Sequence, residues 1–288
     1  MFSRFESSVN IVAHRFNLVY YFGPAGYPEG SKGPVDALER IKILGLNALE
    51  VQFVRQVMMS EEKARLVGEK AKEFGILLSV HAPYYINFNS SNKETVKKSV
   101  EWVLKSARAA GAMDAWIVVI HAGSYGTTPP DVATKNIIKG IRSCRKKLEE
   151  EGYNVHLGLE TMGKKGYWGT PQEIAKVVEE IEGTCPVIDF AHLHARSNGS
   201  IRREDDFENL IKSFEEIYTG RLHIHFSSVE FTDAGEKKHL PLDAKSPDFA
   251  LLAPCLKRRS YDITIISETP LLEKDAVRMK EILSNIKD

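Results

Sequence analysis

The sequence CPVIDFAHLHA, residues 185–195, joins an apolar run of strand length to a carboxylate, Asp189, with His192 three residues further on. Runs rich in Val, Ile and Leu are typical of buried strands, and acids and imidazoles are the side chains that most often bind metal ions. Five further runs also carry such a side chain at or near their C-terminal end. They are LLSVHAP with His81, AWIVVIHAG with His121, VHLGLETM with Glu160, RLHIHFSS with His225 and ITIISETP with Glu268.

Strands of this kind alternate with segments of helical spacing, and this alternation predicts the fold. Eight apolar strands separated by helices indicate a parallel sheet covered by helices and closed into a single-domain (β/α)8 TIM barrel. The expected strands are 17–22, 48–53, 76–81, 115–121, 155–160, 186–189, 222–226 and 261–268. The expected helices, with their caps, are 34–44, 60–74, 93–110, 129–151, 170–181, 204–218, 248–257 and 274–286.

Local signals support these boundaries. Gly75, Gly111 and Gly152 are expected to end three of the helices, since glycine readily adopts the left-handed conformation that follows a helix. No linker-like or low-complexity stretch divides the chain. We therefore expect residues 17–288 to form the barrel domain and residues 1–16 to form an N-terminal extension.

Composition limits the class of protein. The 288 residues include 39 Lys and Arg and 39 Asp and Glu, so a nucleic-acid partner would have to bind a local basic patch. Cys144, Cys185 and Cys255 are widely spaced, which argues against structural disulfides and a thiolate zinc site and fits a reducing cytoplasm. No segment reaches the roughly 18 apolar residues of a membrane span, and no signal-peptide core is visible. We expect a cytoplasmic protein with no membrane partner.

The strand ends predict a metal centre. In a (β/α)8 barrel the active site lies at the C-terminal ends of the strands, where six polar side chains should meet: His81, His121, Glu160, Asp189, His225 and Glu268. Three crowded carboxylates repel one another unless cations lie between them. Mixed imidazole and carboxylate ligands suit zinc, or alternatively manganese, and their number predicts two or three ions. Closely spaced ions of this kind serve phosphoester hydrolysis.

Motifs around these side chains give the chain a resemblance to a known family. They are HAPYYIN with His81, Tyr84 and Asn87, HAGS with His121, Glu-Thr at Glu160, D-x-x-H with Asp189 and His192, and a second Glu-Thr at Glu268. From about Phe22 to its C-terminus the chain resembles the endonuclease IV family. Members of that family are zinc-dependent apurinic/apyrimidinic endonucleases with a xylose-isomerase-like TIM barrel.

The resemblance implies two zinc sites that share one carboxylate. One ion would be held by His81, His121 and Glu160. The second would be held by Glu160, Asp189, His225 and Glu268. Glu160 and Glu268 are the two acids that the resemblance implies for catalysis.

A third zinc site is where the chain departs from the family, which pairs His192 with a D-x-H motif after the seventh strand. The corresponding segment reads GEKKHLPL, residues 235–242, in which His239 matches the histidine but Lys237 replaces the aspartate. Glu236 can act as a ligand instead, so that His192, Glu236 and His239 form a shifted third site. The alternatives are a weak or absent third ion, a Lys237 that contacts phosphate, and a segment that is merely solvated.

The activity that the resemblance implies is hydrolysis of the phosphodiester 5′ of an abasic site in double-stranded DNA, by a monomeric enzyme. The base-less sugar has to leave the helix, so loop residues would enter the duplex, and Tyr84, Asn87 and Arg55 are the expected DNA contacts. Further basic side chains are candidates for binding backbone phosphates: Lys164, Lys165, Arg196, Arg202 and Arg203.

Two other functions remain open at this point. A sugar isomerase or epimerase on the same barrel would need a single divalent ion, for which the set Glu160, Asp189, His225 and Glu268 suffices. Such an enzyme has no need of His81, His121 and His239, and this surplus of histidines favours the nuclease. The replacement at Lys237 also leaves room for a barrel that recognises damaged DNA without cutting it. His156 and His223 lie deeper in the barrel and are interpreted as hydrogen-bonded core groups.

Overall fold

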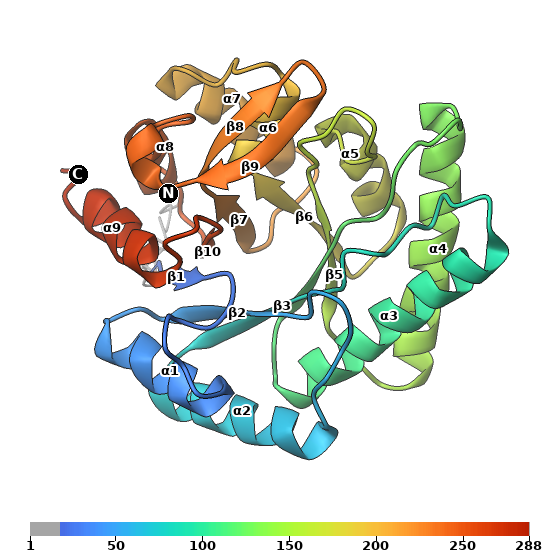
Figure 1. Cartoon of the computed structure of the whole chain (residues 1–288), viewed down its shortest axis with the longest axis horizontal. Coiled ribbons are helices and arrows are strands. Elements are labelled where there is room, and N and C mark those ends of the chain that lie inside the picture. Colours follow the sequence, from blue (N-terminus) through green and yellow to red (C-terminus); the bar gives the residue numbers. More distant parts are fainter. Residues whose placement is uncertain (1–17, 288) are drawn as a thin grey trace, which may run out of the picture.

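The computed structural model describes residues 18–287, and these contain eight parallel strands that form a barrel (Figure 1). Around the barrel the strands follow the order β1-β10-β7-β6-β5-β4-β3-β2. They are β1 (Tyr20–Pro24), β2 (Ala48–Gln52), β3 (Leu77–His81), β4 (Ile117–Ile120), β5 (His156–Glu160), β6 (Thr184–Asp189), β7 (Leu222–Phe226) and β10 (Ile263–Ser267). The prediction of a TIM barrel is confirmed. The expected extension of residues 1–16 and the first residue of the expected strand 17–22 lie outside the described residues.

The barrel closes where its first two strands meet. The amide of Gly26 donates to the carbonyl of Glu50 at 2.9 Å, and the amide of Asn47 donates to the carbonyl of Phe22 at 3.1 Å. Between these two bonds the strands approach so closely that a Cβ on Gly23 would lie 1.9 Å from the carbonyl oxygen of Ala48. Glycine is therefore required here because of this close backbone approach.

Helices surround the barrel and follow the predicted pattern (Figure 1). They are α1 (Pro34–Ile43), α2 (Glu61–Phe74), α3 (Lys93–Ala112), α4 (Pro130–Glu150), α5 (Pro171–Glu180), α7 (Glu204–Glu215), α8 (Phe249–Lys257) and α9 (Glu273–Ser284). Ser60 caps α2 by accepting a hydrogen bond from the amide of Lys63, and Gly75 ends it with a φ of 69°. Thr170 and Glu173 form a capping box at the start of α5. These ends were predictable because each depends on neighbours in the sequence.

The prediction that Gly111 ends a helix is wrong. α3 continues through Gly111 to Ala112, and the chain turns out of the helix at Asp114, which has a φ of 56°. A Cβ on Gly111 would lie 2.5 Å from the ring of Tyr153. The glycine thus provides room for a packed aromatic side chain and does not terminate the helix.

A helix after β6 and a hairpin with a short 3-10 helix after β7 have no counterpart in the predicted pattern. α6 (Phe190–Arg196) begins directly after β6, with the side chain of Asp189 accepting a hydrogen bond from the amide of His192 at its start. β8 (Ser228–Thr232) and β9 (Gly235–Leu240) form an antiparallel hairpin after β7, and a short 3-10 helix (Leu242–Ala244) follows. Both elements lie at the C-terminal end of the barrel strands, so they add residues to the predicted centre.

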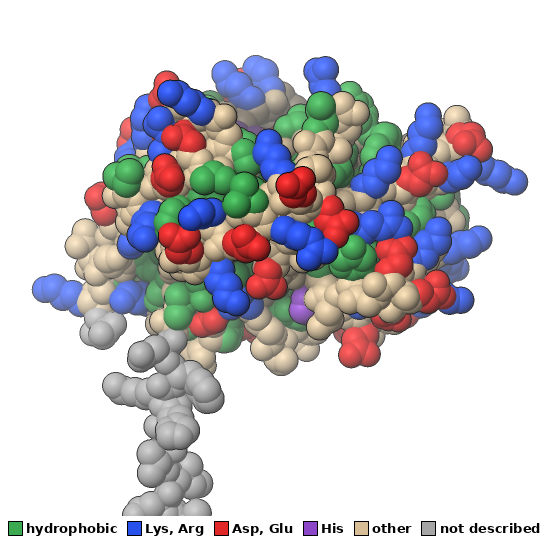
Figure 2. Space-filling view, turned by 90° about the horizontal axis from the view of Figure 1, so that it is seen from below, with side chains coloured by type: hydrophobic (Ala, Val, Ile, Leu, Met, Phe, Trp, Pro, Cys, Tyr) green, Lys and Arg blue, Asp and Glu red, His purple; other side chains and the backbone are tan. Residues whose placement is uncertain are grey.

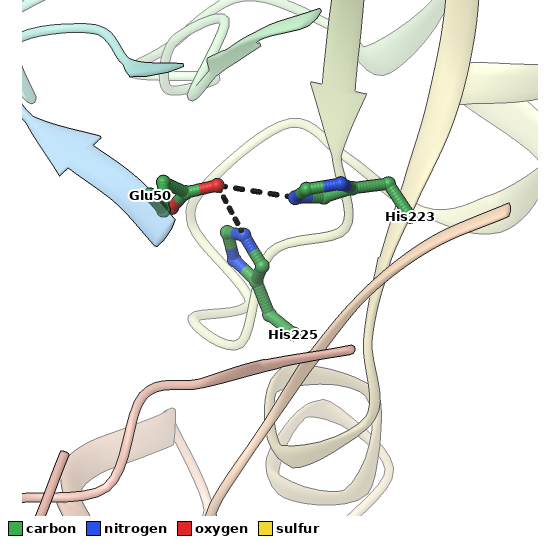
Figure 3. Close-up of side chains that lie close together, drawn as sticks. All are labelled: Glu50, His223 and His225. Carbon is green, nitrogen blue, oxygen red and sulfur yellow. Dashed lines mark hydrogen bonds and ion pairs between the residues drawn. The ribbon is translucent and has the colours of Figure 1, made fainter. Parts of the chain in front are cut away.

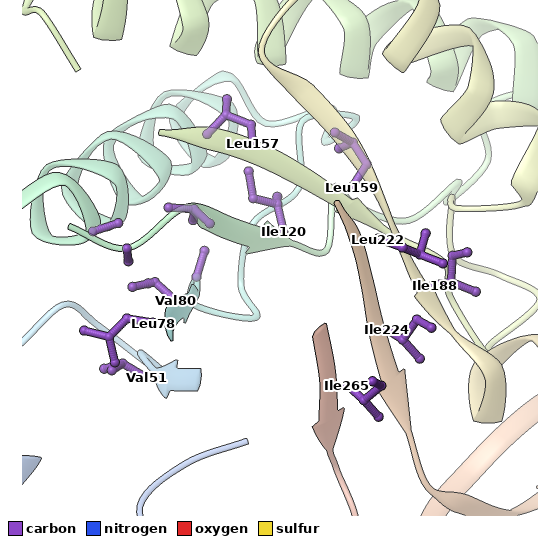
Figure 4. Packing of buried hydrophobic residues seen from close by; sticks show 14 of the residues in the cluster. Val51, Leu78, Val80, Ile120, Leu157, Leu159, Ile188, Leu222, Ile224 and Ile265 are labelled. Atoms are coloured by element: carbon purple, nitrogen blue, oxygen red, sulfur yellow. The ribbon is translucent and has the colours of Figure 1, made fainter. Parts of the chain in front are cut away.

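Side chains on the barrel strands alternate between two faces, as expected for a β-sheet. Outward side chains pack beneath the helices, including, in Figure 4, Val51, Leu78, Val80, Ile120, Leu157, Leu159, Ile188, Leu222, Ile224 and Ile265. Inward side chains form a separate small cluster of Ile117, Val119, Cys185 and Val187. These two inward rows end at His121 and Asp189, so both polar side chains point into the end of the barrel.

The distribution of charged side chains and the state of the cysteines agree with what the composition led us to expect. On the face shown in Figure 2, Lys and Arg side chains are interspersed with Asp and Glu side chains. The three cysteines are buried free thiols. In residues 18–287 every helix is too short or too polar to cross a lipid bilayer.

Replacing Gly23 with alanine tests the closure of the barrel. The added methyl would force β1 and β2 apart, and overpacking of this kind costs about 3 kcal/mol of unfolding free energy. Gly166→Ala is the matched control, because no atom lies within 4 Å of the Cβ position there. Denaturant unfolding should give a large loss for the first variant and a negligible one for the second. Equal stability of the two variants would contradict the proposed closure.

Candidate metal centre

The centre is built around Glu160, the last residue of β5, whose side chain is fully buried. Its Oε2 lies 2.8 Å from Nε2 of His121 and 3.2 Å from Nε2 of His81. Its Oε1 lies 3.3 Å from Nδ1 of His225 and 3.3 Å from Nδ1 of His192. Imidazoles from β3, β7, α6 and the residue directly after β4 therefore meet at the carboxylate of β5.

Three groups of possible metal ligands adjoin one another at this end of the barrel. In each group the ligand atoms lie within 4.8 Å of one another: His81, His121 and Glu160; Glu160, Asp189, His192 and Glu268; and His192, Glu236 and His239. His225 reaches the second group, since its Nδ1 is 3.3 Å from Oε1 of Glu268. The structure thus brings together every residue that the sequence indicated as a metal ligand.

A β-bulge shapes the third group. Residues three apart on a regular strand point to opposite faces. On β9, however, Glu236 and His239 lie on the same side, with Oε1 of Glu236 3.6 Å from Nε2 of His239. Both face His192, whose Nε2 lies 3.3 Å from Oε2 of Glu236 and whose ring centre lies 5.4 Å from that of His239. The register between β8 and β9 shifts at Glu230, so that Lys237 is the extra residue of the bulge. The exposed Lys237 lies 2.5 Å from Glu230. Its ammonium thus pairs within the hairpin, and Glu236 takes the position next to His192.

For His81 and His192, hydrogen bonds to the backbone determine which ring nitrogen is available to bind a metal ion. Nδ1 of His81 faces the carbonyl of Ala82 at 2.8 Å, and Nδ1 of His192 faces the carbonyl of Thr161 at 2.8 Å. Because a carbonyl only accepts, Nδ1 carries the proton in both rings and Nε2 is free to bind a metal. Partners of this kind fix the tautomer of metal-binding histidines.

Buried charges in the centre shift the pKa values of its acids and imidazoles. Burial alone would raise the pKa of Glu160, but the imidazoles of His121 and His225 outweigh it and hold this pKa well below its usual value. Burial would likewise lower the pKa of His81, yet the hydrogen bond that its ring donates to Glu160 raises this pKa to about 9. The pKa values of His192 and His225 are raised as well, since neighbouring acids outweigh the effect of burial, so the metal-free centre favours protons on His81, His192 and His225 beside an ionised Glu160.

The two neighbouring acids behave in the opposite way. Burial, with repulsion from Glu160, raises the pKa values of Asp189 and Glu268, although His192 and His225 respectively oppose the shift. Oδ2 of Asp189 is buried and has no hydrogen-bond partner in the part of the chain that the structure describes. A buried carboxylate oxygen without a partner is costly, and a cation beside it would remove that cost. The donor set and this oxygen fit divalent metal ions such as zinc.

Sequence reasoning missed one acid, Glu50 on β2. It is fully buried below the centre, and its Oε2 lies 3.1 Å from Nε2 of both His223 and His225 (Figure 3). Burial would raise the pKa of Glu50, but His225 and His223 hold it well below its usual value. An acid within the apolar run ALEVQF, two residues from either end of β2, was the available signal. His223, interpreted as a hydrogen-bonded core group, is indeed bonded to Glu50.

The expected DNA contacts lie apart from the ligand groups. Tyr84 and Tyr85 stand exposed on the loop after β3 with their rings 4.1 Å apart, and Arg55 is exposed after β2. Asn87 is partly buried, and its amide donates to Oγ of Ser124 at 3.2 Å. Asn87 therefore joins the loops after β3 and β4.

The expected phosphate-binding arginines are largely engaged in the fold. Arg196 donates to the carbonyls of Met162, Lys164 and Tyr167 at 2.7–3.3 Å. Arg202 donates to the carbonyl of Gly199, and Arg203 pairs with Asp206. Lys165 is engaged as well, since its Nζ donates to Oδ1 of Asn198 at 3.0 Å, and Nζ of Lys164 lies 5.9 Å from the centre of the Tyr167 ring.

Comparison with known proteins defines the class to which this barrel belongs. A family model described as xylose isomerase-like TIM barrel matches residues 38–286, so the chain belongs to this family. Within it, the chain is 32% identical over 275 residues to an uncharacterized protein of Methanocaldococcus jannaschii, a match that covers 93% of this chain and 98% of that protein. It is also 28% identical over 219 residues to a protein of Staphylococcus carnosus named "Probable endonuclease 4", with 72% of this chain and 71% of the relative covered. The expected resemblance to endonuclease IV is confirmed.

Solved structures share the fold. A D-tagatose 3-epimerase-like protein has a TM-score of 0.70 at 22% identity, with 88% of this chain and 93% of that chain covered. Endonuclease IV from Thermus thermophilus has a TM-score of 0.66 at 19% identity, with 92% and 97% covered. At these identities the likeness shows the fold alone, and the activity has to be argued from the site.

Asp189→Asn tests whether the unpartnered carboxylate oxygen belongs to a metal site. Asparagine caps a helix as well as aspartate does, so the metal-free variant should unfold near the wild-type temperature. Zinc at 100 times its Kd should stabilise the wild-type protein by about 2.7 kcal/mol, and a tenfold weaker site should give about 1.4 kcal/mol less. Thermal unfolding with and without zinc measures this difference.

The matched control is Asp248→Asn, the same substitution at the first residue before α8, where Asp248 accepts a hydrogen bond from the amide of Ala250. It should leave the stabilisation by zinc unchanged. Equal stabilisation of Asp189→Asn and wild type by zinc would show that Asp189 is not a ligand.

Proposed function

We propose that the protein is a metal-dependent phosphodiesterase of the endonuclease IV type, which acts as a monomer and hydrolyses the DNA backbone 5′ of abasic sites. The observation that supports it best is the number of imidazoles around one acid. His81, His121, His192 and His225 all lie within 3.3 Å of Glu160. A single ion cannot use this many ligands, whereas two or three ions sharing Glu160 can.

The proposed ligand sets follow from the three groups. His81, His121 and Glu160 would hold one ion, and Glu160, Asp189, His225 and Glu268 would hold a second. His192, Glu236 and His239 would hold a third, with Glu236 in place of the aspartate of the family motif. Zinc, or alternatively manganese, would supply an activated water and positive charge for the phosphoryl oxygens when bound.

The side chains of the centre have separate tasks in this proposal. Glu160 would belong to both of the first two sites, because its Oε2 faces the imidazoles of His81 and His121 and its Oε1 faces that of His225. Glu268 lies beside Nδ1 of His225 and is less enclosed than Glu160, with 16% of its side chain exposed. Glu268 would therefore be the acid of the second set that lies nearest to an incoming phosphodiester.

Residues of the surrounding loops would bind the DNA. The paired rings of Tyr84 and Tyr85 are 48% and 45% exposed, which suits stacking against an unstacked nucleotide. Arg55 and Lys164 are proposed to contact the backbone, and Asn87 to hold the loop that carries the tyrosines.

A sugar epimerase is the second candidate, favoured by the set Glu160, Asp189, His225 and Glu268, which is complete without the other histidines. It requires one ion per chain and predicts no role for His81, His121 and His239. The positions of these three rings, in two further ligand groups, are why we prefer the nuclease.

Incision of a duplex with one abasic site tests the proposal. His81→Ala and His121→Ala should each lower the rate by more than about 100-fold, since an ion contributes several kcal/mol to transition-state stabilisation. His156→Ala, at the opposite end of β5, is the control and should keep nearly full activity. A chelator should abolish incision, and added zinc should restore it.

The proposal fails if the wild-type protein leaves the abasic duplex intact at saturating zinc, or if both ligand variants cut as fast as wild type. Conversion of a ketose into its 3-epimer by protein with one bound ion would establish the epimerase instead.

A further inference from the structure

Glu50 lies directly below the proposed metal centre and contacts one of its ligands. Its Oε2 accepts a hydrogen bond from Oγ of Ser79 at 2.9 Å and lies 3.1 Å from Nε2 of both His223 and His225 (Figure 3). Its Oε1 accepts from the side chain of Gln52 at 3.0 Å. Both oxygens of a fully buried carboxylate thus have partners on β2, β3 and β7.

His225 lies between this acid and the centre. Its Nε2 faces Glu50, while its Nδ1 faces Glu160 and Glu268 at 3.3 Å each. A neutral imidazole has one N–H, and an ionised carboxylate only accepts. A metal on the upper side requires the lone pair of Nδ1, so the proton has to reside on Nε2 and point at Glu50.

The carboxylate distinguishes His225 from other histidines of the centre. His81 and His192 turn their remaining nitrogen to backbone carbonyls, and His239 turns Nδ1 to the hydroxyl of Ser227 at 2.6 Å. The partners of His81 and His239 on this side are neutral, and Nδ1 of His192 shares its position with acids of the centre itself. Among these rings, and within residues 18–287, only His225 has a charged partner outside the proposed ligand sets, Glu50. A carboxylate behind a metal-bound imidazole orients the ring and makes its other nitrogen more basic.

We propose that Glu50 is a positioning residue for the metal centre: it holds the Nε2–H of His225, so that Nδ1 of this ring is presented to the ion bound by Glu160, Asp189 and Glu268. The inference rests on the proposed function to the extent that it takes His225 as a metal ligand, and it is independent of the substrate. A purely structural role would not require an acid at this buried position, because charge is costly to bury and Glu50 has imidazole partners on only one of its oxygens.

Glu50→Gln removes the charge with little change of shape. Zinc affinity, measured by competition with a chromophoric chelator, should fall about 10–100-fold for one ion per chain and stay unchanged for the others. The visible spectrum of the cobalt-substituted protein should change for the same ion. Ser79→Ala is the matched control: it removes another hydrogen bond to Oε2 of Glu50, spares the contact with His225, and should leave affinity and spectrum within about twofold of wild type.

Nitrogen-15 NMR of the histidine rings in wild-type protein tests the inference without relying on a variant that folds. Zinc-loaded protein should show His225 protonated on Nε2 and coordinated through Nδ1. Protonation of Nδ1 would overturn the proposal, as would wild-type affinity for every ion in Glu50→Gln. Protein that binds zinc with this tautomer but cuts no abasic DNA would refute the proposed nuclease and support the role of Glu50.

Discussion

The buried carboxylate of Glu160 and the four imidazoles that surround it form the interaction on which the architecture of the site depends. An ionised group inside a protein is costly unless several opposite charges or hydrogen-bond donors reach it. Here the partners come from β3, the residue after β4, β7 and α6, so they can meet only when the barrel is closed. The barrel closes on its other side, where β1 approaches β2 at Gly23. This closure is therefore needed for the four imidazoles to reach Glu160 at the end of β5.

The centre also illustrates how a binding site is arranged at some expense to stability. Oδ2 of Asp189 has no hydrogen-bond partner in residues 18–287, and burial raises the pKa values of Asp189 and Glu268. In the metal-free protein, neighbouring acids raise the pKa values of His81, His192 and His225, so protons on these rings substitute for cations. Metal binding would displace these protons, which couples ion affinity to the protonation of the whole cluster.

Much of the fold could be predicted because it depends on local patterns. The seventh strand, 222–226, was predicted without error, and the caps at Ser60 and Thr170 follow from side chains next to the helix they start. The ends of six strands also indicated the residues that gather at the centre. Side-chain alternation and the parallel order of the strands suffice for this inference.

Other features depend on contacts that the sequence does not reveal. Gly111 resembled a helix stop, but its role is set by Tyr153, 42 residues further along the chain. The bulge at Lys237 depends on its pairing with β8, so the shared face of Glu236 and His239 could not be deduced from spacing. Glu50 was overlooked because an acid inside a strand carries no motif, and only packing against His225 gives it significance.

Anomalous diffraction at the zinc edge, on crystals grown with zinc, tests the central claim most directly. We predict at least two peaks, one about 2.0–2.2 Å from ligand atoms of His81, His121 and Glu160 and one at similar distances from Glu160, Asp189, His225 and Glu268. A single peak confined to the second set, or an absence of peaks at saturating zinc, would contradict the account.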